Sequence, residues 1–563
     1  MDKHRFRWIL GWATLLGAAL LLAGGTTVAT GAPAAKQLKQ HVLLNASQVG
    51  PSDGTMSAPA ARAMQQGYLV PNQAAYMQAK GITSSGTSSG ASLHAPMTPL
   101  SSLAPIATGG WDGLINPNSA PSDSTSSVGT SRFIETVNSN YAIYNKGAAA
   151  PISTGTLNAL AGISGSAFDP QIMWDSQTNR FYYAMDVVVS SATHVLGVGF
   201  SKTPSPNTSA DWCKYSVNYG ANFPDYPKLG DSAFFWIIGS NVFNSADAFI
   251  GSDAIGISKP ANGAITICPS ATTFKFGEKF DLRDSTNGPA FTPVPVNQTD
   301  VDAGPGYIVA RTGSLPSTRF SLHRVNKAAS GVPVFTSPGS AVVVPGYTVP
   351  PNAVQRASFP NGNKRLDTLD SRPTQAVSGY DPAHPTVSGA PRLGIWVQHT
   401  TNTIPAARSE VRWYEINPLA NNLFQLGKVN NPSWFAFNGA IAPDRSGYVA
   451  LANRHGQNMV LGFDTSGTGS VPAVRMVSKL GLAAQSLPVI VRVSPGNYVG
   501  FDCAGTDNDC RWGDYAGASP DPFPFGGASG HPTGKVWLTS QYASGGISTL
   551  QSNWKTWNWA ATP

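Results

Sequence analysis

The chain has 563 residues, of which only 12% are charged, and its formal net charge of +7 is spread without basic runs. Because a protein that follows a phosphate backbone needs clustered cations, this distribution excludes nucleic acid as an expected partner. The 58 glycines and 44 prolines, with 14 tryptophans, 17 tyrosines and 24 phenylalanines, favour many short strands separated by turns around an aromatic core. We therefore expect an all-β protein.

The amino terminus has the pattern of a secretory signal. Lys3, Arg5 and Arg7 precede an apolar run over residues 8–23, and small residues follow it. The run is shorter than the ~20 residues of a full membrane span. We predict a signal peptide over residues 1–32 and no membrane span after its cleavage, which places the protein outside the cell or on its surface. An uncleaved anchor is the alternative.

Residues 33–110 are rich in Ala, Ser, Gly, Pro and Gln and poor in aromatic residues. Such a segment buries too little apolar surface to offset its conformational entropy, so we predict a largely disordered spacer. The globular domain is then expected to cover residues 111–563.

The stretch over residues 171–201 predicts a three-stranded antiparallel meander. Short strands over residues 171–174, 181–189 and 195–200 are separated by small polar residues that stabilise tight turns. The same sequence of turn, aromatic or β-branched strand, turn and strand recurs as far as Trp554–Trp559, which we interpret as a closing strand. Blades of four antiparallel strands arranged in a ring fit this pattern, at ~40–50 residues per blade plus insertions.

We predict a β-propeller of seven blades, with six or eight as alternatives. A pair of stacked β-sandwich domains is the competing architecture, although no break in composition marks a boundary between two domains.

Four cysteines in an exported chain indicate two disulfides. Cys503 and Cys510 are close enough to enclose a small loop, which leaves Cys213 and Cys268 as the second pair. The other two connectivities stay open from the sequence.

Several stretches together resemble secreted bacterial β-propeller proteins of mostly unassigned activity, broadly sialidase-like or BNR-like in architecture. The matching stretches are Trp111–Leu114, Pro121–Asp123, Val137–Tyr144, Phe223–Gly230, Arg365–Arg372, Val411–Glu415 and Cys510–Tyr515. The resemblance implies the fold and carries no residue-by-residue activity, because propellers include both enzymes and binding platforms.

Two predicted turns combine an Asp-Tyr pair with a nearby cation. If both turns lie at one mouth of the propeller, they form a polar pocket suited to sugar hydroxyls. An alternative is that the aspartates only cap turns by accepting backbone hydrogen bonds. The candidate ligand-binding residues are Asp225, Tyr226, Lys228 and Asp231 from the first turn, Arg511, Trp512, Asp514 and Tyr515 from the second, and Arg372 from an arginine-rich segment. For that segment, salt bridges with Asp367 and Asp370 are the alternative.

Asp502, Asp507 and Asp509 crowd carboxylates around the predicted Cys503–Cys510 loop, and calcium binds such oxygen clusters. The spacing is not that of an EF-hand, so a solvated acidic loop is the alternative. We expect no other cofactor.

Recognisable catalytic signatures are absent from the sequence. It has no zinc-protease helix motif, nucleophile elbow or phosphate loop. Of its four glutamates, only Glu415 adjoins a tyrosine, and strand alternation places Tyr414 on the opposite face.

We therefore predict a monomeric binding or scaffolding module for a polysaccharide or an extracellular protein, more a non-enzyme than an enzyme. A sialidase-like hydrolase or a lyase that uses mouth aspartates is the alternative. A structural component of a surface layer is a third possibility.

Overall fold

The computed structural model describes residues 41–49, 104–300, 304–403, 407–445, 447–449, 453–504, 509–522, 534–546 and 550–563. The predicted signal peptide and most of the predicted spacer lie outside the described residues. Two parts of that spacer are strands: all of β1 (Leu43–Asn45) and most of β2 (Ile106–Asp112). Within the described ranges, no helix is long and apolar enough to cross a membrane.

The described chain is almost entirely β, as its composition predicted. The α-helix that it contains is α3 (Leu157–Ala161), which begins at a Thr156 cap and ends at Gly162 with a φ of 68°. Four short 3-10 turns are η1 (Ala46–Gln48), η2 (Ser209–Asp211), η3 (Ala271–Thr273) and η5 (Phe501–Ala504).

Seven sheets of four or five strands follow one another along the described chain, and the successive strands of each are antiparallel. The first comprises β3 (Thr125–Val128), β4 (Arg132–Val137), β5 (Asn140–Asn145) and β6 (Pro151–Thr156). The second comprises β7 (Ser166–Asp175), β8 (Arg180–Ser190), β9 (Thr193–Ser201) and β10 (Trp212–Gly220), with β1 at its edge. The third comprises β11 (Phe223–Asp231), β12 (Phe235–Phe243), β13 (Phe249–Ser258) and β14 (Phe276–Phe280). The fourth comprises β15 (Ala290–Pro295), β17 (Gly306–Thr312), β18 (Ser317–Lys327) and β19 (Pro333–Thr336), with β20 (Val342–Tyr347) also beside β18.

The remaining three sheets complete the series. The fifth comprises β23 (Pro373–Asp381), β24 (Arg392–Asn402), β25 (Ser409–Asn417) and β26 (Asn422–Val429), with β16 (Asn297–Gln298) parallel to β23. The sixth comprises β27 (Phe435–Pro443), β30 (Met459–Gly467), β31 (Ser470–Lys479) and β32 (Val489–Val493). The seventh comprises β34 (Gly517–Pro520), β35 (Val536–Ala543), β36 (Trp554–Thr562) and β2. Two small additions are the sheet of β21 (Ala353–Val354), β22 (Arg365–Leu366) and β33 (Asp509–Cys510), and the hairpin of β28 (Gly447–Val449) and β29 (Asn453–His455).

Contacts between the first strands of these sheets run in a closed cycle. β3 contacts β7, β7 contacts β11, β11 contacts β15, β15 contacts β23, β23 contacts β27, β27 contacts β34, and β34 contacts β3. A ring of four-stranded antiparallel sheets, each packed between two neighbours, is a β-propeller. The predicted fold class is confirmed, and the alternative of two stacked sandwiches is wrong because layered sheets would not close such a cycle.

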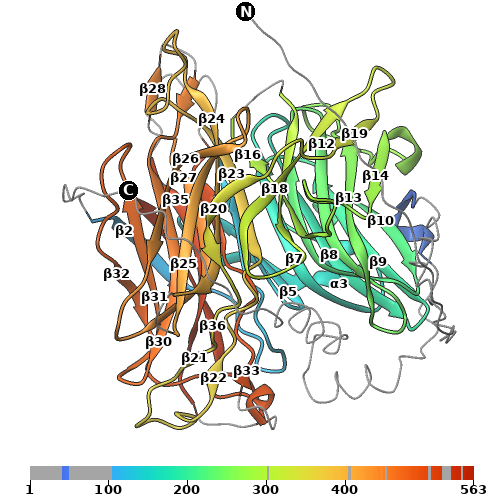
Figure 1. The fold of residues 1–563 in the computed structure, drawn as a ribbon. Coiled ribbons are helices and arrows are strands. Elements are labelled where there is room, and N and C mark those ends of the chain that lie inside the picture. The colour runs from blue at the N-terminus through green and yellow to red at the C-terminus, as the bar shows by residue number, and fades with distance from the viewer. Residues whose placement is uncertain are drawn as a thin grey trace, which may run out of the picture. The chain divides into compact units, whose positions relative to one another are not determined.

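The ring is closed by strands from the two ends of the described domain. β2 pairs antiparallel with β36 and becomes the outermost strand of the last sheet, so it lies among the C-terminal strands (Figure 1). Trp554 and Trp559 are buried in β36. The prediction of a closing strand at this position is confirmed.

The meander predicted over residues 171–201 corresponds to β7, β8 and β9, and β8 is buried at every residue. The prediction of a turn at Asp225 and Tyr226 is wrong, because the segment Phe223–Asp231 is the innermost strand β11. Its prolines and Asp-Tyr pair indicated a turn, but they form a bulge inside a strand that is buried throughout.

Both predicted disulfides are confirmed. Cys213–Cys268 has a Cα–Cα distance of 5.3 Å and joins β10 to the segment before η3. Cys503–Cys510 has a Cα–Cα distance of 4.3 Å and joins η5 to β33.

Candidate functional site

The innermost strands of four sheets carry the same bulge. Between Phe168 and Gln171, Asp225 and Lys228, Phe291 and Val294, and Phe437 and Ala440, each strand contains one more residue than its partner. The bulged residues Asp169, Tyr226, Thr292 and Asn438 have φ values of 50°, 59°, 53° and 50°. Proline or glycine follows each of them, which suits a position outside the hydrogen-bond ladder. The bulges re-aim side chains at one end of the ring.

We call the polar groups gathered at this end the mouth cluster: Asp123, Asp169, Asp225, Tyr226, Lys228, Arg372, Arg511, Asp514 and Tyr515. Hydrogen bonds, ring contacts and charge interactions connect them, although they come from separate sheets and loops. Every member is buried, with at most 7% of its surface exposed.

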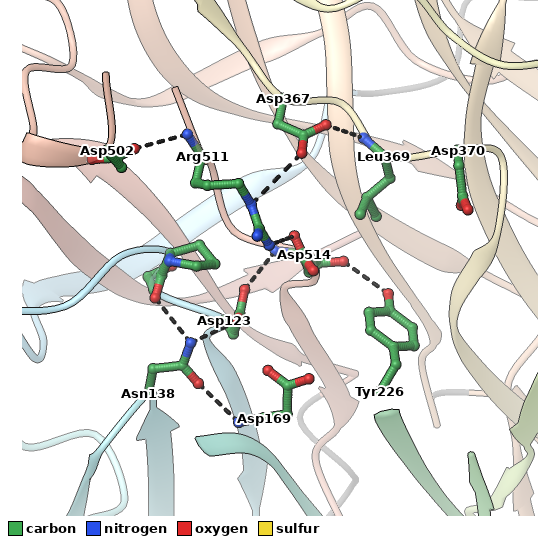
Figure 2. A network of polar contacts seen from close by, with 12 residues as sticks. Asp123, Asn138, Asp169, Tyr226, Asp367, Leu369, Asp370, Asp502, Arg511 and Asp514 are labelled. Carbon is green, nitrogen blue, oxygen red and sulfur yellow. Dashed lines mark hydrogen bonds and ion pairs between the residues drawn. The ribbon is translucent and has the colours of Figure 1, made fainter. Parts of the chain in front are cut away.

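Backbone and side-chain hydrogen bonds join the two ends of the domain within this cluster (Figure 2). The Asp514 backbone N–H donates to Asp123 Oδ1 at 2.7 Å, and Tyr226 Oη donates to the Asp514 carbonyl at 2.9 Å. Arg511 Nη2 donates to Asp514 Oδ1 at 2.9 Å. Asn138 donates to Asp123 Oδ2 at 2.6 Å and accepts from the Asp169 backbone N–H at 2.9 Å. These contacts fix the positions of Asp123 and Asp514.

The Lys228 amine lies between two aromatic rings. Its Nζ is 3.8 Å from the Tyr226 ring centroid and 3.3 Å from the Tyr515 ring centroid. It is 1% exposed and has no hydrogen-bond partner among the described residues. Burial lowers the pKa of Lys228 well below its usual value, although Asp169, Asp123 and Asp514 act in the opposite direction. The two tyrosine rings enclose the Lys228 amine here, so they do not form an open platform for sugar stacking.

The carboxyl groups of Asp169 and Asp225 have pKa values that are raised toward neutral pH. Burial and the neighbouring Asp225 charge raise the pKa of Asp169 to about 7. Burial raises the pKa of Asp225 to about 6, although the Arg372 charge lowers it. No hydrogen bond or ion pair reaches the Asp225 carboxylate from a described residue. Asp225 is therefore able to accept a hydrogen bond from a ligand.

An arginine network supports the cluster from the side. Arg372 Nε and Nη2 donate to the two oxygens of Asp370 at 2.7 and 2.8 Å, in the bidentate geometry that gives strong pairs. The Arg372 guanidinium lies 4.6 Å from the Tyr226 ring centroid. Arg311, which is fully buried, approaches Asp370 Oδ2 at 3.7 Å. The segment that follows β22 therefore holds Tyr226 in place.

A small cavity lies beside Lys228 of the mouth cluster, among residues of several innermost strands. This cavity of about 20 Å³, lined by Ser126, Gln171, Lys228 and Thr374 among others, has room for about one water molecule.

A wider recess lies beside the β17–β18 hairpin. It has a volume of about 350 Å³, and Thr286, Thr312, Ser317 and Tyr347 are among the residues that line it. Arg319 also lines it, and its guanidinium forms no hydrogen bond, ion pair or ring contact with a described residue. Thr312 follows Arg311, so the recess adjoins the arginine network of the mouth cluster.

The structure brings together seven of the nine candidate residues: Asp225, Tyr226, Lys228, Arg372, Arg511, Asp514 and Tyr515. Asp231 does not join them, because it pairs with Lys259 Nζ at 2.7 Å near the opposite end of β11. Trp512 is buried elsewhere, where its Nε1 donates to Asp464 Oδ2 at 2.8 Å. A ligand role for any of the nine stays a prediction.

The residues proposed for calcium have protein partners where they are described. Asp502 accepts from Tyr498 Oη and from the Arg511 backbone N–H, both at 2.8 Å. Asp509 pairs with Arg365 Nε at 2.7 Å. Asp507 lies outside the described residues, and calcium binding at this loop stays a prediction.

Sequence reasoning missed Asp123 and Asp169, whereas the expected pairing of Asp370 with the arginine-rich segment is confirmed by its contact with Arg372. Asp169 had a usable signal, because Phe168–Pro170 and Phe291–Pro293 share a Phe-x-Pro pattern at the same bulge. Asp123 had none, since its contact with Asp514 joins positions that are 391 residues apart in the sequence.

No family model matches the sequence, and no curated protein matches it. The solved structures with some similarity include a mutant of the apocarotenoid oxygenase from Synechocystis, with a TM-score of 0.33 and 10% identity over 65% of this chain and 74% of that chain. The WD40 domain of SCAP from fission yeast has a TM-score of 0.28 and 7% identity over 76% and 81% of the two chains. A GH62 hydrolase in complex with xylotriose has a TM-score of 0.25 and 10% identity over 60% and 90%. Scores this low carry no argument, so the propeller assignment rests on the sheet order and contacts described above.

Proposed function

We propose that this protein is an exported binding module that takes an acidic saccharide in the recess beside the β17–β18 hairpin. The observation that carries the proposal is the recess of about 350 Å³ with the Arg319 guanidinium in its wall and no described partner for that group. Ligand pockets in proteins start at about 300 Å³. A planar guanidinium binds a carboxylate in bidentate geometry. The hydroxyls of Thr286, Thr312, Ser317 and Tyr347 donate to protein oxygens, so their lone pairs are what they offer to sugar hydroxyls.

The position of the recess and the covalent chemistry of the chain support this role. Two disulfides fit an oxidising compartment outside the cytosol. Thr312 of the recess wall follows Arg311, which approaches Asp370 Oδ2 at 3.7 Å, so this wall adjoins the arginine network.

Calorimetric titration of the purified protein with galacturonate and glucuronate oligosaccharides, and with their neutral counterparts, tests the proposal. Arg319→Gln should weaken binding of the acidic series about 10–150-fold, because a hydrogen bond to a charged group contributes about 1.5–3 kcal/mol. Arg283→Gln is the matched control, since Arg283 already pairs with Asp281 at an exposed position. Equal affinity for acidic and neutral oligosaccharides, or unchanged binding by Arg319→Gln, would contradict the proposal.

A second function, glycoside hydrolysis at the mouth cluster, is favoured by the raised pKa values of Asp169 and Asp225. A carboxyl group that is protonated near neutral pH is suited to general-acid catalysis. The test is turnover of a panel of chromogenic glycosides by the wild-type protein and by Asp225→Asn. Turnover that the replacement abolishes supports this function, and the lack of any turnover rejects it.

A further inference from the structure

Three potential metal ligands meet where the β10 sheet contacts the β13–β14 pair. They are His41, which precedes β1, Asp253 in β13 and Glu278 in β14. A ring nitrogen of His41 and one oxygen of each carboxylate all lie within 4.8 Å of one another. His41 Nδ1 is 2.6 Å from Glu278 Oε1, and the His41 backbone N–H donates to Glu278 Oε2 at 2.8 Å.

The strand register explains why the two carboxylates are neighbours. Asp253 lies opposite Phe280 and Ile255 lies opposite Glu278, so Asp253 and Glu278 form a diagonal pair on one face of the sheet. β1 pairs with β10 and thereby brings His41 to the same place, where its ring packs 4.1 Å from that of Tyr219. The grouping depends on three segments and is not a local sequence motif.

Asp253 is the residue that points to a ligand. Its side chain is fully buried, its Oδ2 accepts from Tyr219 Oη at 2.6 Å, and no N–H or hydroxyl group of a described residue donates to its Oδ1, which leaves Glu278 as its polar neighbour. No lysine or arginine of the described chain forms an ion pair with Asp253 or Glu278. Two adjacent carboxylates without a strong cation are unfavourable unless a proton or a metal ion lies between them.

A second group with the same residue types differs in its charge balance. Asp381, His384 and Glu415 also bring their ligand atoms within 4.8 Å of one another, and one Glu415 oxygen is unpartnered. The Lys479 charge acts on Glu415 there, and Gln425 donates to Glu415 Oε2 at 2.6 Å. A nearby ammonium group disfavours a second cation, so this group is a natural control.

We propose that His41, Asp253 and Glu278 bind one divalent transition-metal ion of the Zn²⁺ class. Imidazole nitrogen and carboxylate oxygen are both zinc ligands, and three protein ligands plus a water complete a tetrahedral shell. Ca²⁺ is disfavoured because it takes six to eight oxygen ligands. Tyr219 acts as a positioning residue, since its hydroxyl orients Asp253. The bound ion ties the segment that begins at His41 to the β13–β14 pair.

The test is calorimetric titration of the full-length, chelator-treated protein with Zn²⁺, with Ca²⁺ and Mg²⁺ as separate arms. We expect one Zn²⁺ per chain, a higher melting temperature with Zn²⁺, and no comparable response to Ca²⁺ or Mg²⁺. Asp253→Asn and His41→Gln should abolish this binding. Tyr219→Phe should weaken it about 10–100-fold, as is typical for loss of an outer-shell partner. His384→Gln should bind Zn²⁺ as the wild type does.

The metal-free melting temperature separates loss of binding from loss of folding. Asp253→Asn removes one of two adjacent carboxylates, and the amide oxygen of the new asparagine can still accept from the Tyr219 hydroxyl. The melting temperature of the metal-free variant should therefore be no lower than that of the metal-free wild type. The proposal is overturned if the wild type does not bind Zn²⁺, if His41→Gln binds it unchanged, or if Ca²⁺ binds equally well.

Discussion

Replacing Asp225 by asparagine is expected to stabilise the protein progressively as the pH rises. Burial raises the pKa of this carboxyl group from 3.8 to about 6 in the folded state. A group whose folded-state pKa lies above its unfolded value stabilises the fold fully below pH 3.8, and it loses this contribution as the pH rises through about 6. Asparagine does not titrate and keeps a constant contribution.

The size of the effect follows from the same two pKa values. At 1.36 kcal/mol per pH unit, the difference between 3.8 and about 6 corresponds to about 3 kcal/mol over the whole titration. About 1.4 kcal/mol of this falls between pH 5 and pH 8, where the protein is convenient to study. No hydrogen bond from a described residue reaches the carboxylate, so the replacement removes no protein contact of that kind.

The assay is guanidinium denaturation of the wild type and Asp225→Asn at intervals from pH 5 to pH 8, followed by tryptophan fluorescence. The difference in unfolding free energy between the two proteins should grow with pH in favour of the variant. Asp247→Asn, in a partly exposed turn, is the control. A flat difference, or a variant that loses stability as the pH rises, would refute the reasoning and show that Arg372 holds Asp225 as an anion.

Three further predictions concern folding stability. Lys228→Met should raise the denaturation midpoint at pH 7, because burial lowers the pKa of the unpartnered amine and so favours the unfolded chain wherever lysine is charged; a lower midpoint would indicate net pairing with the mouth carboxylates. Replacing both cysteines of the Cys213–Cys268 bridge by serine should lower the free energy of unfolding by about 4 kcal/mol, because this bridge spans 55 residues. The same replacement at Cys503–Cys510, which spans 7 residues, should lower it by about 2 kcal/mol. Equal losses in urea denaturation would contradict the loop-entropy argument. Gly230→Ala should lower the free energy of unfolding by about 1–3 kcal/mol, because a Cβ atom would lie 2.4 Å from the Pro295 backbone carbon. In Gly339→Ala the Cβ atom meets no atom within 4 Å, so this control should have the melting temperature of the wild type.

The sequence predicted strands correctly where strand-forming residues dominate, and it predicted a turn wrongly where turn-forming residues lie inside a strand. β8 and β9 follow from local chemistry, since aromatic and β-branched runs are bounded by small polar residues. Phe223–Asp231 has the same turn-forming residues, yet it is strand β11. Burial on both faces between neighbouring sheets overrides the local preference of its prolines, and the bulge at Tyr226 absorbs the residue that does not fit the ladder.

The candidate site was predicted only in part, because closeness in the sequence does not show which side chains meet in the ring. The Asp-Tyr pairs at Asp225 and Asp514 were visible in the sequence, and the ring brings them together. Asp231 was included with Asp225 because they are close in the chain. They lie near opposite ends of one strand, since six residues of strand span about 20 Å.

By itself, the sequence determined that this chain is built from short antiparallel strands and indicated two disulfides, because turn and strand residues act over a few neighbouring positions. The pairing of the four cysteines was decided by the structure. Only the tertiary structure decided which polar groups share a site. Asp123 and Asp514 are separated by 391 positions, and they meet because the last sheet packs against the first. Ring closure is a property of all the sheets together, so no local stretch of residues encodes the mouth cluster or the group formed by His41, Asp253 and Glu278.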